Sequence, residues 1–179
     1  MLMSMAQVVA FRGTCSRLQV GAVFSRGGRV ISTGYNGAPA GLPHCSHFTW
    51  DGAGLAPEWL RTLPFDYEDS EVWTEFIIKG GHKLHWDGGK LTSSIDAPGC
   101  SVAEHAERNG IAFAARYGLA LEHSELHTTH LPCPDCARSI INAGVERVVY
   151  SRGYRITEGK KLLEAAGIKV DQLPSIDDI

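Results

Sequence analysis

Apolar residues along the chain fall into short blocks that glycine and polar residues separate, and their spacing predicts the secondary structure. Residues 1–12 are predicted to form a helix. Residues 20–24 and 29–33 are predicted strands, joined by a turn over residues 25–28, where two glycines follow a serine and an arginine. The chain is therefore expected to open with a helix and a hairpin.

Helices and strands are predicted to alternate after residue 105. The expected elements are a helix from His105 to a stop at Gly118, a strand at 126–129, a helix after Cys133 ending at 143–144, a strand at 145–150, a helix at 158–166 and a strand at 168–170. Such alternation favours parallel pairing. The predicted fold class is α/β, a three-layer α/β/α sandwich with a central mixed five-stranded sheet.

The pattern weakens between Cys45 and Cys100. All four tryptophans lie there, together with prolines and glycines that interrupt any period. We expect a single domain over residues 1–179 that carries an insertion at about 46–99. The insertion either folds back on the core or forms a lid or subunit contact, because aromatic residues are enriched at such surfaces.

Composition narrows the function classes. The net charge of −3 and the lack of a basic stretch with interleaved aromatic residues argue against a polynucleotide partner. No apolar run is long enough to suggest a membrane span, and the apolar start lacks the basic region of a signal peptide. Five cysteines in 179 residues, two of them in a metal-type motif, indicate a reducing compartment, and we expect a cytoplasmic protein.

Two short motifs supply metal-binding chemistry. His105-Ala106-Glu107 is expected on a helix, and Cys133-Pro134-Asp135-Cys136 follows one strand later. One imidazole and two thiolates suit a catalytic zinc site, which keeps three protein ligands and leaves a fourth position for water. A C-x-x-C pair alone would suggest a redox pair or another kind of zinc site, but the upstream histidine and glutamate favour catalytic zinc.

Glu107 is the candidate acid and base of this centre. Two residues from His105 on a helix, it should point away from the ligand direction and toward bound water and substrate. Zinc lowers the pKa of its water toward about 7, and a carboxylate can then move the proton. Pro134 suits the first position of a helix, which would place both thiols at a helix N-terminus, where the dipole favours thiolate.

Further segments carry a family resemblance. They are Thr14-Cys15-Ser16-Arg17, Val20-Gly21-Ala22-Val23, Gly34-Tyr35-Asn36-Gly37-Ala38-Pro39-Ala40-Gly41 and His44-Cys45. Together with the zinc motifs, H-x-E followed by P-C-x-x-C, they resemble the deoxycytidylate (dCMP) deaminases. The chain departs from the usual pattern at Gly13, where serine is frequent, and at Gly110, where alanine is common.

The resemblance implies a reaction and its control. It implies hydrolysis of dCMP to dUMP and ammonia, with zinc-bound hydroxide attacking C4 and Glu107 moving protons. It also implies a homo-hexamer that dCTP, with Mg²⁺, activates and dTTP inhibits. A deaminase for a 5-substituted dCMP or another small base is an alternative. A non-catalytic zinc module that binds nucleotides is a third, which the intact Glu107 argues against.

The resemblance also assigns roles to individual positions. The substrate residues it implies are Asn36 at the sugar, the backbone of Ala106 and Leu131 at the cytosine edge, and Arg17 and Tyr154 near the phosphate and ring; the effector residues are Gly34, Tyr35, Asn36 and Gly37. Guanidinium groups fit phosphate bidentately, which supports Arg17. The plainer alternatives are a solvated surface arginine, a core tyrosine and an ordinary strand-end turn.

Three cysteines remain outside the catalytic set. Some relatives hold a second, structural zinc at the positions of Cys15 and Cys45. Cys100 could join them, with His85 as the fourth ligand, because His82 and His85 are three residues apart. Such a site would attach the insertion to the core. Three buried free cysteines are the alternative.

Overall fold

The structure is a computed structural model of the full chain. It describes residues 1–15, 18–41, 76–78, 82–87, 90–94 and 103–174, with the three short stretches at 76–94 described by their backbone alone. The chain divides into two compact units, which we describe separately. The first comprises residues 1–13, 19–36 and 104–179, and the second comprises residues 14–18 and 37–103.

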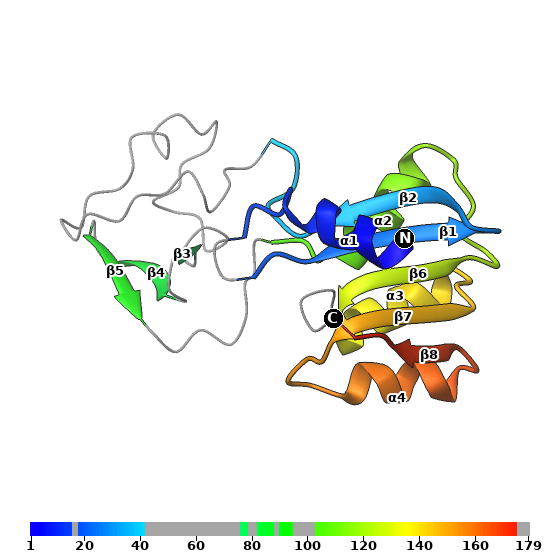
Figure 1. Ribbon diagram of the computed structural model, residues 1–179. Helices are drawn as coiled ribbons and strands as arrows, with labels where there is room; N and C mark the ends of the chain where they lie inside the picture. The colour runs from blue at the N-terminus through cyan, green and yellow to red at the C-terminus, as the bar shows by residue number, and fades with distance from the viewer. Residues whose placement is uncertain (16–17, 42–75, 79–81, 88–89, 95–102, 175–179) are drawn as a thin grey trace. The chain divides into compact units, whose positions relative to one another are not determined.

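The first unit is built on a five-stranded sheet with the order β2-β1-β6-β7-β8. Its strands are β1 (Gly21–Arg26), β2 (Arg29–Tyr35), β6 (Glu125–His130), β7 (Arg147–Arg152) and β8 (Lys169–Gln172). β1 runs antiparallel to both β2 and β6, whereas β6, β7 and β8 are parallel. The sheet is therefore mixed, as the sequence predicts (Figure 1).

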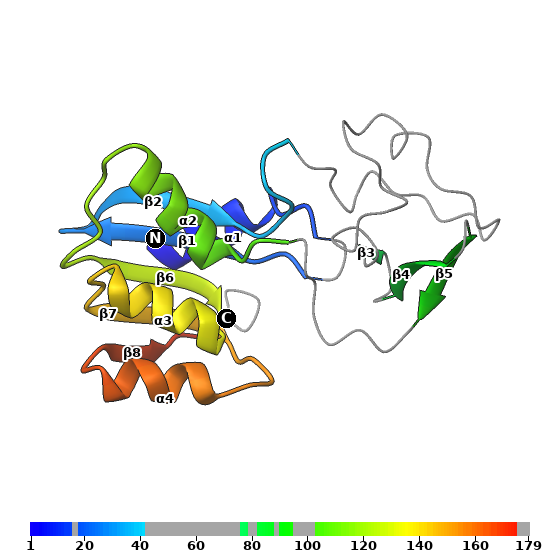
Figure 2. The same cartoon turned by 180° about the vertical axis from the view of Figure 1, so that it is seen from behind.

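Helices cover the two faces of this sheet unequally. Helix α1 (Leu2–Ala10) lies on one face, and α2 (Ala106–Arg116), α3 (Pro134–Asn142) and α4 (Glu158–Ala165) lie on the other (Figures 1 and 2). The larger core packs Phe24 and Leu126 of the sheet against Ile140 and Leu163 of the helices. A smaller core lies beneath α1. The predicted three-layer α/β/α sandwich is confirmed.

One edge of the sheet collects the segments that carry the motifs. The parallel strands β6 and β7 end there, β2 ends there as well, and α3 begins just beyond β6. In open α/β sheets, ligands bind outside the carboxyl ends of the strands. The topology therefore predicts a ligand site at this edge.

Helix α2 rests directly on β2 because two glycines face each other. A Cβ atom at Gly34 would lie 2.1 Å from the Ala106 carbonyl oxygen and 2.4 Å from the Gly110 amide nitrogen, so no side chain fits at position 34. The Ser32 hydroxyl donates to the Gly110 carbonyl at 2.7 Å. Tight backbone packing thus fixes the start of α2 against the end of β2.

The secondary structure matches the prediction with small shifts at element ends. Gly118, the predicted stop of the helix after His105, has a φ of 67°, the left-handed conformation that glycine adopts at little cost. The last two strands, β7 and β8, extend two residues beyond their predicted ends because backbone pairing continues past the apolar core. The main difference concerns His105, which precedes α2 and does not belong to it.

The second unit contains a small antiparallel sheet of β3 (Phe76–Ile78), β4 (His82–Asp87) and β5 (Lys90–Ser94). These strands were not predicted, because strands this short give only a weak alternation of apolar and polar residues. The predicted insertion at 46–99 falls within this unit. Within the described residues, no helix has the length and hydropathy to cross a membrane.

We expect Gly110→Ala to destabilise the fold by about 1–3 kcal/mol, as overpacking in a core typically does. The added Cβ would lie 2.6 Å from Cε2 of Phe24, whose ring is fully buried. Alanine is otherwise the better helix former by roughly 1 kcal/mol. Because the clash with the Phe24 ring causes the destabilisation, Gly110→Ala should lower the free energy of unfolding by less in a protein that also carries Phe24→Leu. Denaturant unfolding of both single variants and the double variant measures this coupling, and additive free energies would contradict it.

Candidate metal and catalytic centre

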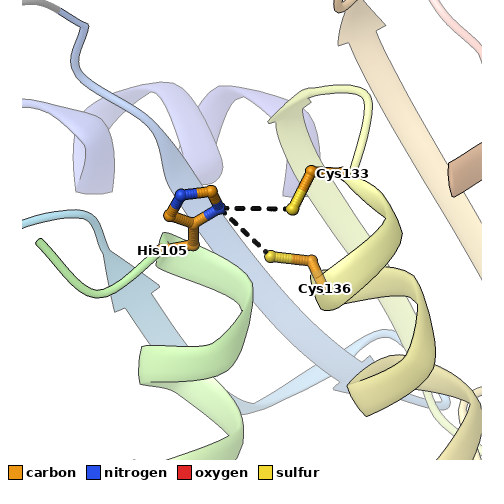
Figure 3. Close-up of side chains that lie close together, drawn as sticks. All are labelled: His105, Cys133 and Cys136. Carbon is orange, nitrogen blue, oxygen red and sulfur yellow. Dashed lines mark hydrogen bonds between the residues drawn. The ribbon is translucent and has the colours of Figure 1, made fainter. Parts of the chain in front are cut away.

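Three potential metal ligands converge at the sheet edge. The ligand atoms of His105, Cys133 and Cys136 all lie within 4.8 Å of one another. Nδ1 of His105 is 3.5 Å from Sγ of Cys133 and 3.4 Å from Sγ of Cys136. The imidazole reaches across from the start of α2 to both thiols at the start of α3 (Figure 3).

These distances fit zinc. Zn–N bonds of about 2.0–2.1 Å and Zn–S bonds of about 2.3 Å in a tetrahedral shell set nitrogen and sulfur about 3.5 Å apart. The two nitrogen–sulfur distances observed here are 3.5 and 3.4 Å. One imidazole and two thiols are also a donor set that zinc prefers. The three residues therefore meet both the geometric and the chemical requirement for holding zinc.

Each of the two motifs lies at the beginning of a helix. His105 is the N-cap of α2, with an extended backbone at φ −76° and ψ 151°. Cys133 is likewise the N-cap of α3, followed by Pro134 in the first turn as predicted. The expectation that His105 sits on the helix is wrong. Its extended backbone is the usual conformation of an N-cap residue, and the helix begins one residue later.

The two thiols have opposite protonation preferences. The Cys136 thiol stabilises the neighbouring thiolate, and this hydrogen bond lowers the pKa of Cys133 to about 3. The same hydrogen bond, together with burial, raises the pKa of Cys136. The hydrogen bond to Cys133 also raises the pKa of His105. A cation binding here would favour thiolate at both sulfurs, because metal ligands must be deprotonated.

Glu107 is a carboxyl group on the buried face of α2. It is 4% exposed and shares that face with Ala106, Gly110 and Ala114. Sγ of Cys136 donates to its Oε2 at 3.5 Å, so the carboxyl group reaches into the cluster. The prediction that Glu107 points away from the ligand direction assumed that His105 and Glu107 share a helix. It does not apply, because His105 lies outside α2. Burial raises the pKa of Glu107, which suits a group that alternately takes and gives a proton.

A residue that sequence analysis missed holds His105 in place. Oε1 of Glu104 accepts from the His105 amide at 2.9 Å and from Nε of Arg108 at 2.6 Å. The spacing of Glu104 and Arg108 is the i,i+4 spacing of a helical ion pair, which the sequence does display. The carboxylate thus joins the ligand-bearing backbone to the first turn of α2.

Two of the predicted substrate residues lie at the adjoining end of β2 and the start of α2. Asn36 is buried, and its Oδ1 accepts from the Val20 amide at 2.7 Å, which fixes the orientation of its side-chain amide. Gly13 leaves room for that side chain, because a Cβ there would lie 2.8 Å from Oδ1 of Asn36. Ala106 is fully buried as the first residue of α2.

Two further predicted substrate residues, Leu131 and Tyr154, follow β6 and β7. The Leu131 amide donates to the Arg152 carbonyl at 2.9 Å, so any contact from the Leu131 backbone to a base would use its carbonyl. Tyr154 is half-buried after β7, with the Arg155 guanidinium carbon 5.9 Å from its ring centroid.

The predicted effector segment belongs mainly to a strand. Gly34 and Tyr35 are the last two residues of β2, which excludes an ordinary strand-end turn at these two positions. The Tyr35 carbonyl accepts from Nδ2 of Asn109 at 2.7 Å, and the Arg12 guanidinium carbon lies 5.9 Å from the Tyr35 ring centroid. Gly37 belongs to the second unit, where a Cβ atom would meet the Thr14 hydroxyl at 2.1 Å.

Several predicted residues lie outside the described part of the chain. They are Arg17, Cys45, Cys100 and the side chain of His85. Cys15 is described as a half-buried free thiol. The predicted second zinc site and the predicted phosphate contact of Arg17 therefore stay predictions.

Comparison with known proteins agrees with the site. The family described as "Cytidine and deoxycytidylate deaminase zinc-binding region" matches residues 1–152. The deoxycytidylate deaminase of Enterobacteria phage T2 is 30% identical over 98% of this chain and 92% of its own. That of Mycobacterium phage D29 is 32% identical over 84% of this chain and 91% of its own. ComE operon protein 2 of Bacillus subtilis is 31% identical, over 96% and 68%.

Solved structures show the same relationship. The dCMP deaminase of cyanophage S-TIM5, in complex with dCMP and dUMP, aligns with a TM-score of 0.62 at 26% identity, covering 96% of this chain and 93% of its own. The fold, the three convergent ligands and the buried glutamate agree with these relationships. The chain belongs to the cytidine and deoxycytidylate deaminase family, as a zinc-dependent deaminase of the deoxycytidylate deaminase group.

Proposed function

We propose that the protein hydrolyses dCMP to dUMP and ammonia. The observation that carries this proposal is Glu107, a buried carboxyl group 3.5 Å from a thiol of a zinc-type cluster. A module that only binds nucleotides does not need an acid–base group there. The similarity to dCMP deaminases of phages T2 and D29, across most of each chain, supports this choice of substrate.

Glu107 would move the protons of this reaction. Zinc, when bound, supplies a water whose pKa is low enough for attack on C4 of the base. Glu107 takes a proton from that water and delivers it to N3 of the ring. It then takes the proton of the hydroxyl group newly bonded to C4 and passes it to the amino nitrogen, so that the C4–N bond breaks, ammonia leaves and C4 keeps the oxygen as a carbonyl. Its raised pKa keeps the carboxyl group able to hold each proton in turn.

Groups at the same edge of the sheet would bind the nucleotide. The Ala106 amide is among the first amides of α2, which have no partner within the helix, so it can donate to the base. The Leu131 carbonyl can accept from the exocyclic amine of cytosine. Asn36 would contact the sugar, and Tyr154 the region of the phosphate and the ring. Arg17, which lies outside the described residues, is assigned to that same region from the family resemblance alone. A 5-substituted dCMP is the alternative substrate, and it differs only in the space required near C5.

The proposal includes regulation and further metal ions. Gly34, Tyr35, Asn36 and Gly37 would bind dCTP with Mg²⁺ as activator or dTTP as inhibitor, within a cytoplasmic homo-hexamer. A second zinc would use Cys15, Cys45, Cys100 and His85. These parts rest on the family resemblance, and Cys15 alone among those four ligands has a described side chain.

Glu107→Gln should retain zinc and lose at least about 10²–10⁴-fold in turnover of dCMP, the usual contribution of a general acid–base group. Glutamine keeps the shape of the side chain but cannot carry the proton. Metal analysis and single-turnover ammonia release test this, and Glu164→Gln, an exposed position on α4, is the matched control. Near-normal turnover by the zinc-loaded Glu107→Gln variant would refute the proposed role.

Arg17→Ala should raise the KM for dCMP by about 10- to 150-fold, which corresponds to one lost hydrogen bond to a charged group. The KM for deoxycytidine, which has no phosphate, should change little. Ammonia release from dCMP, 5-methyl-dCMP, CMP and deoxycytidine gives the four values. Arg29→Ala, at the opposite end of β2 from Tyr35, is the control. Equal effects on dCMP and deoxycytidine would remove Arg17 from the phosphate site.

The rate against dCMP concentration should be sigmoidal without effector, become hyperbolic with dCTP and Mg²⁺, and be depressed by dTTP. An effector shifts a two-state equilibrium only through its different affinities for the two states. Tyr35→Leu should raise the dCTP concentration required, whereas Tyr117→Leu, at the end of α2, should not. Gly34 is unsuitable for substitution because of its contact with Ala106. Sedimentation reports the assembly; a monomer, or hyperbolic kinetics indifferent to both nucleotides, would exclude this regulation.

A further inference from the structure

The backbone that carries Cys133 is held from both ends. The Leu131 amide donates to the Arg152 carbonyl at 2.9 Å, which extends the pairing of β6 with β7 by one residue. The Cys133 carbonyl accepts from the Ala137 amide at 2.9 Å, the first hydrogen bond of α3. The loop between β6 and α3 is therefore short, because hydrogen bonds hold its backbone at residue 131 and again at residue 133.

Two prolines make this loop stiff. Pro132 and Pro134 have fixed φ angles, and each restricts the residue before it to extended conformations. Cys133 accordingly has φ −70° and ψ 168°. The Pro132 side chain is fully buried, so it has no open space into which to shift. A displacement of the Pro132 peptide would therefore pass directly to Cys133.

Helix α4 packs against that peptide through a residue without a side chain. Gly159 is buried in the first turn of α4. A Cβ atom there would lie 2.0 Å from the Pro132 carbonyl oxygen and 3.0 and 3.1 Å from the carbonyl carbon and oxygen of Cys133. All three neighbours are backbone atoms, which cannot swing aside as a flexible side chain does. Glycine is unfavourable within helices, so its presence here calls for a packing reason.

We infer that Gly159 is a positioning residue of the metal centre. Its bare backbone seats the Pro132–Cys133 peptide against α4, and the seated peptide holds the Cys133 thiol 3.5 Å from Nδ1 of His105. Gly159 is 26 positions beyond Cys133 in sequence, and the three atoms nearest to a Cβ at Gly159 belong to backbone and not to a ligand side chain. The inference rests on the zinc site of the proposed function but does not depend on dCMP being the substrate.

Gly159→Ala tests the inference against Gly153→Ala. A Cβ at Gly153 would meet nothing within 4 Å, so this glycine of the same β7–α4 connection is a matched control. Zinc affinity by chelator competition should fall at least tenfold in Gly159→Ala and stay within twofold in Gly153→Ala. The absorption bands of the Co²⁺-substituted protein should shift only in Gly159→Ala, because they report ligand geometry. Unchanged affinity and unchanged bands in a folded Gly159→Ala protein would overturn the inference.

A measurement on the unaltered protein decides the matter if Gly159→Ala does not fold. Removing zinc should speed amide hydrogen exchange in the first turn of α4, at residues 158–161, as well as at 133–137, because the two segments share a backbone contact. If the exchange rates at residues 158–161 do not change when zinc is removed, the inference about Gly159 is overturned and the proposed function is not affected. A wild-type protein that binds no zinc would overturn the proposed function and this inference together.

Discussion

The metal centre depends on one constraint, the fixed separation of two helix beginnings. His105 and Cys133 are 28 residues apart in sequence, yet their ligand atoms must lie about one tetrahedral edge from each other. Neither helix can satisfy this by itself. Helix α2 is fixed by backbone packing of Gly34 against Ala106 and Gly110. Small errors in the seating of either helix would separate the imidazole from the thiols.

Placing the ligands at N-caps also serves the electrostatics. The N-terminus of a helix carries partial positive charge, which favours the thiolates that zinc requires. Cys133 is the N-cap of α3, and Cys136 lies within the first turn. Glu107 lies in the first turn of α2, where the same dipole partly offsets the cost of burying a carboxylate. Burial nevertheless raises the pKa of Glu107 above its ordinary value.

Residues beyond the motifs complete the centre and connect it to the fold. Glu104 holds the His105 amide and the Arg108 side chain, while Asn109 fastens α2 to the Tyr35 carbonyl. Gly110 accommodates the Phe24 ring, which accounts for a glycine inside α2. The contacts of Asn109 and Gly110 join helix and sheet positions that are far apart in sequence. Only the Glu104–Arg108 pair has a spacing that sequence analysis could have recognised.

Sequence by itself determined the elements and the chemistry. Apolar periodicity located the sheet strands and helices of the first unit, and Pro134 marked the start of α3. The residue types of the two motifs identified a zinc-type donor set with a free carboxylate, because ligand preference is a local chemical property. Local patterns also carried too little signal for β3, β4 and β5, which are short.

Tertiary structure alone decided how these parts meet. The helix assignment of His105 was wrong because an N-cap and a first helical residue differ in backbone angles and not in residue type. The contact between Gly159 and Pro132 was also decided by the tertiary structure, because no regular sequence spacing predicts it. Periodicity specifies which face of an element is buried. The ångström-scale distances between ligand atoms follow from how the buried faces pack, which depends on the whole fold at once.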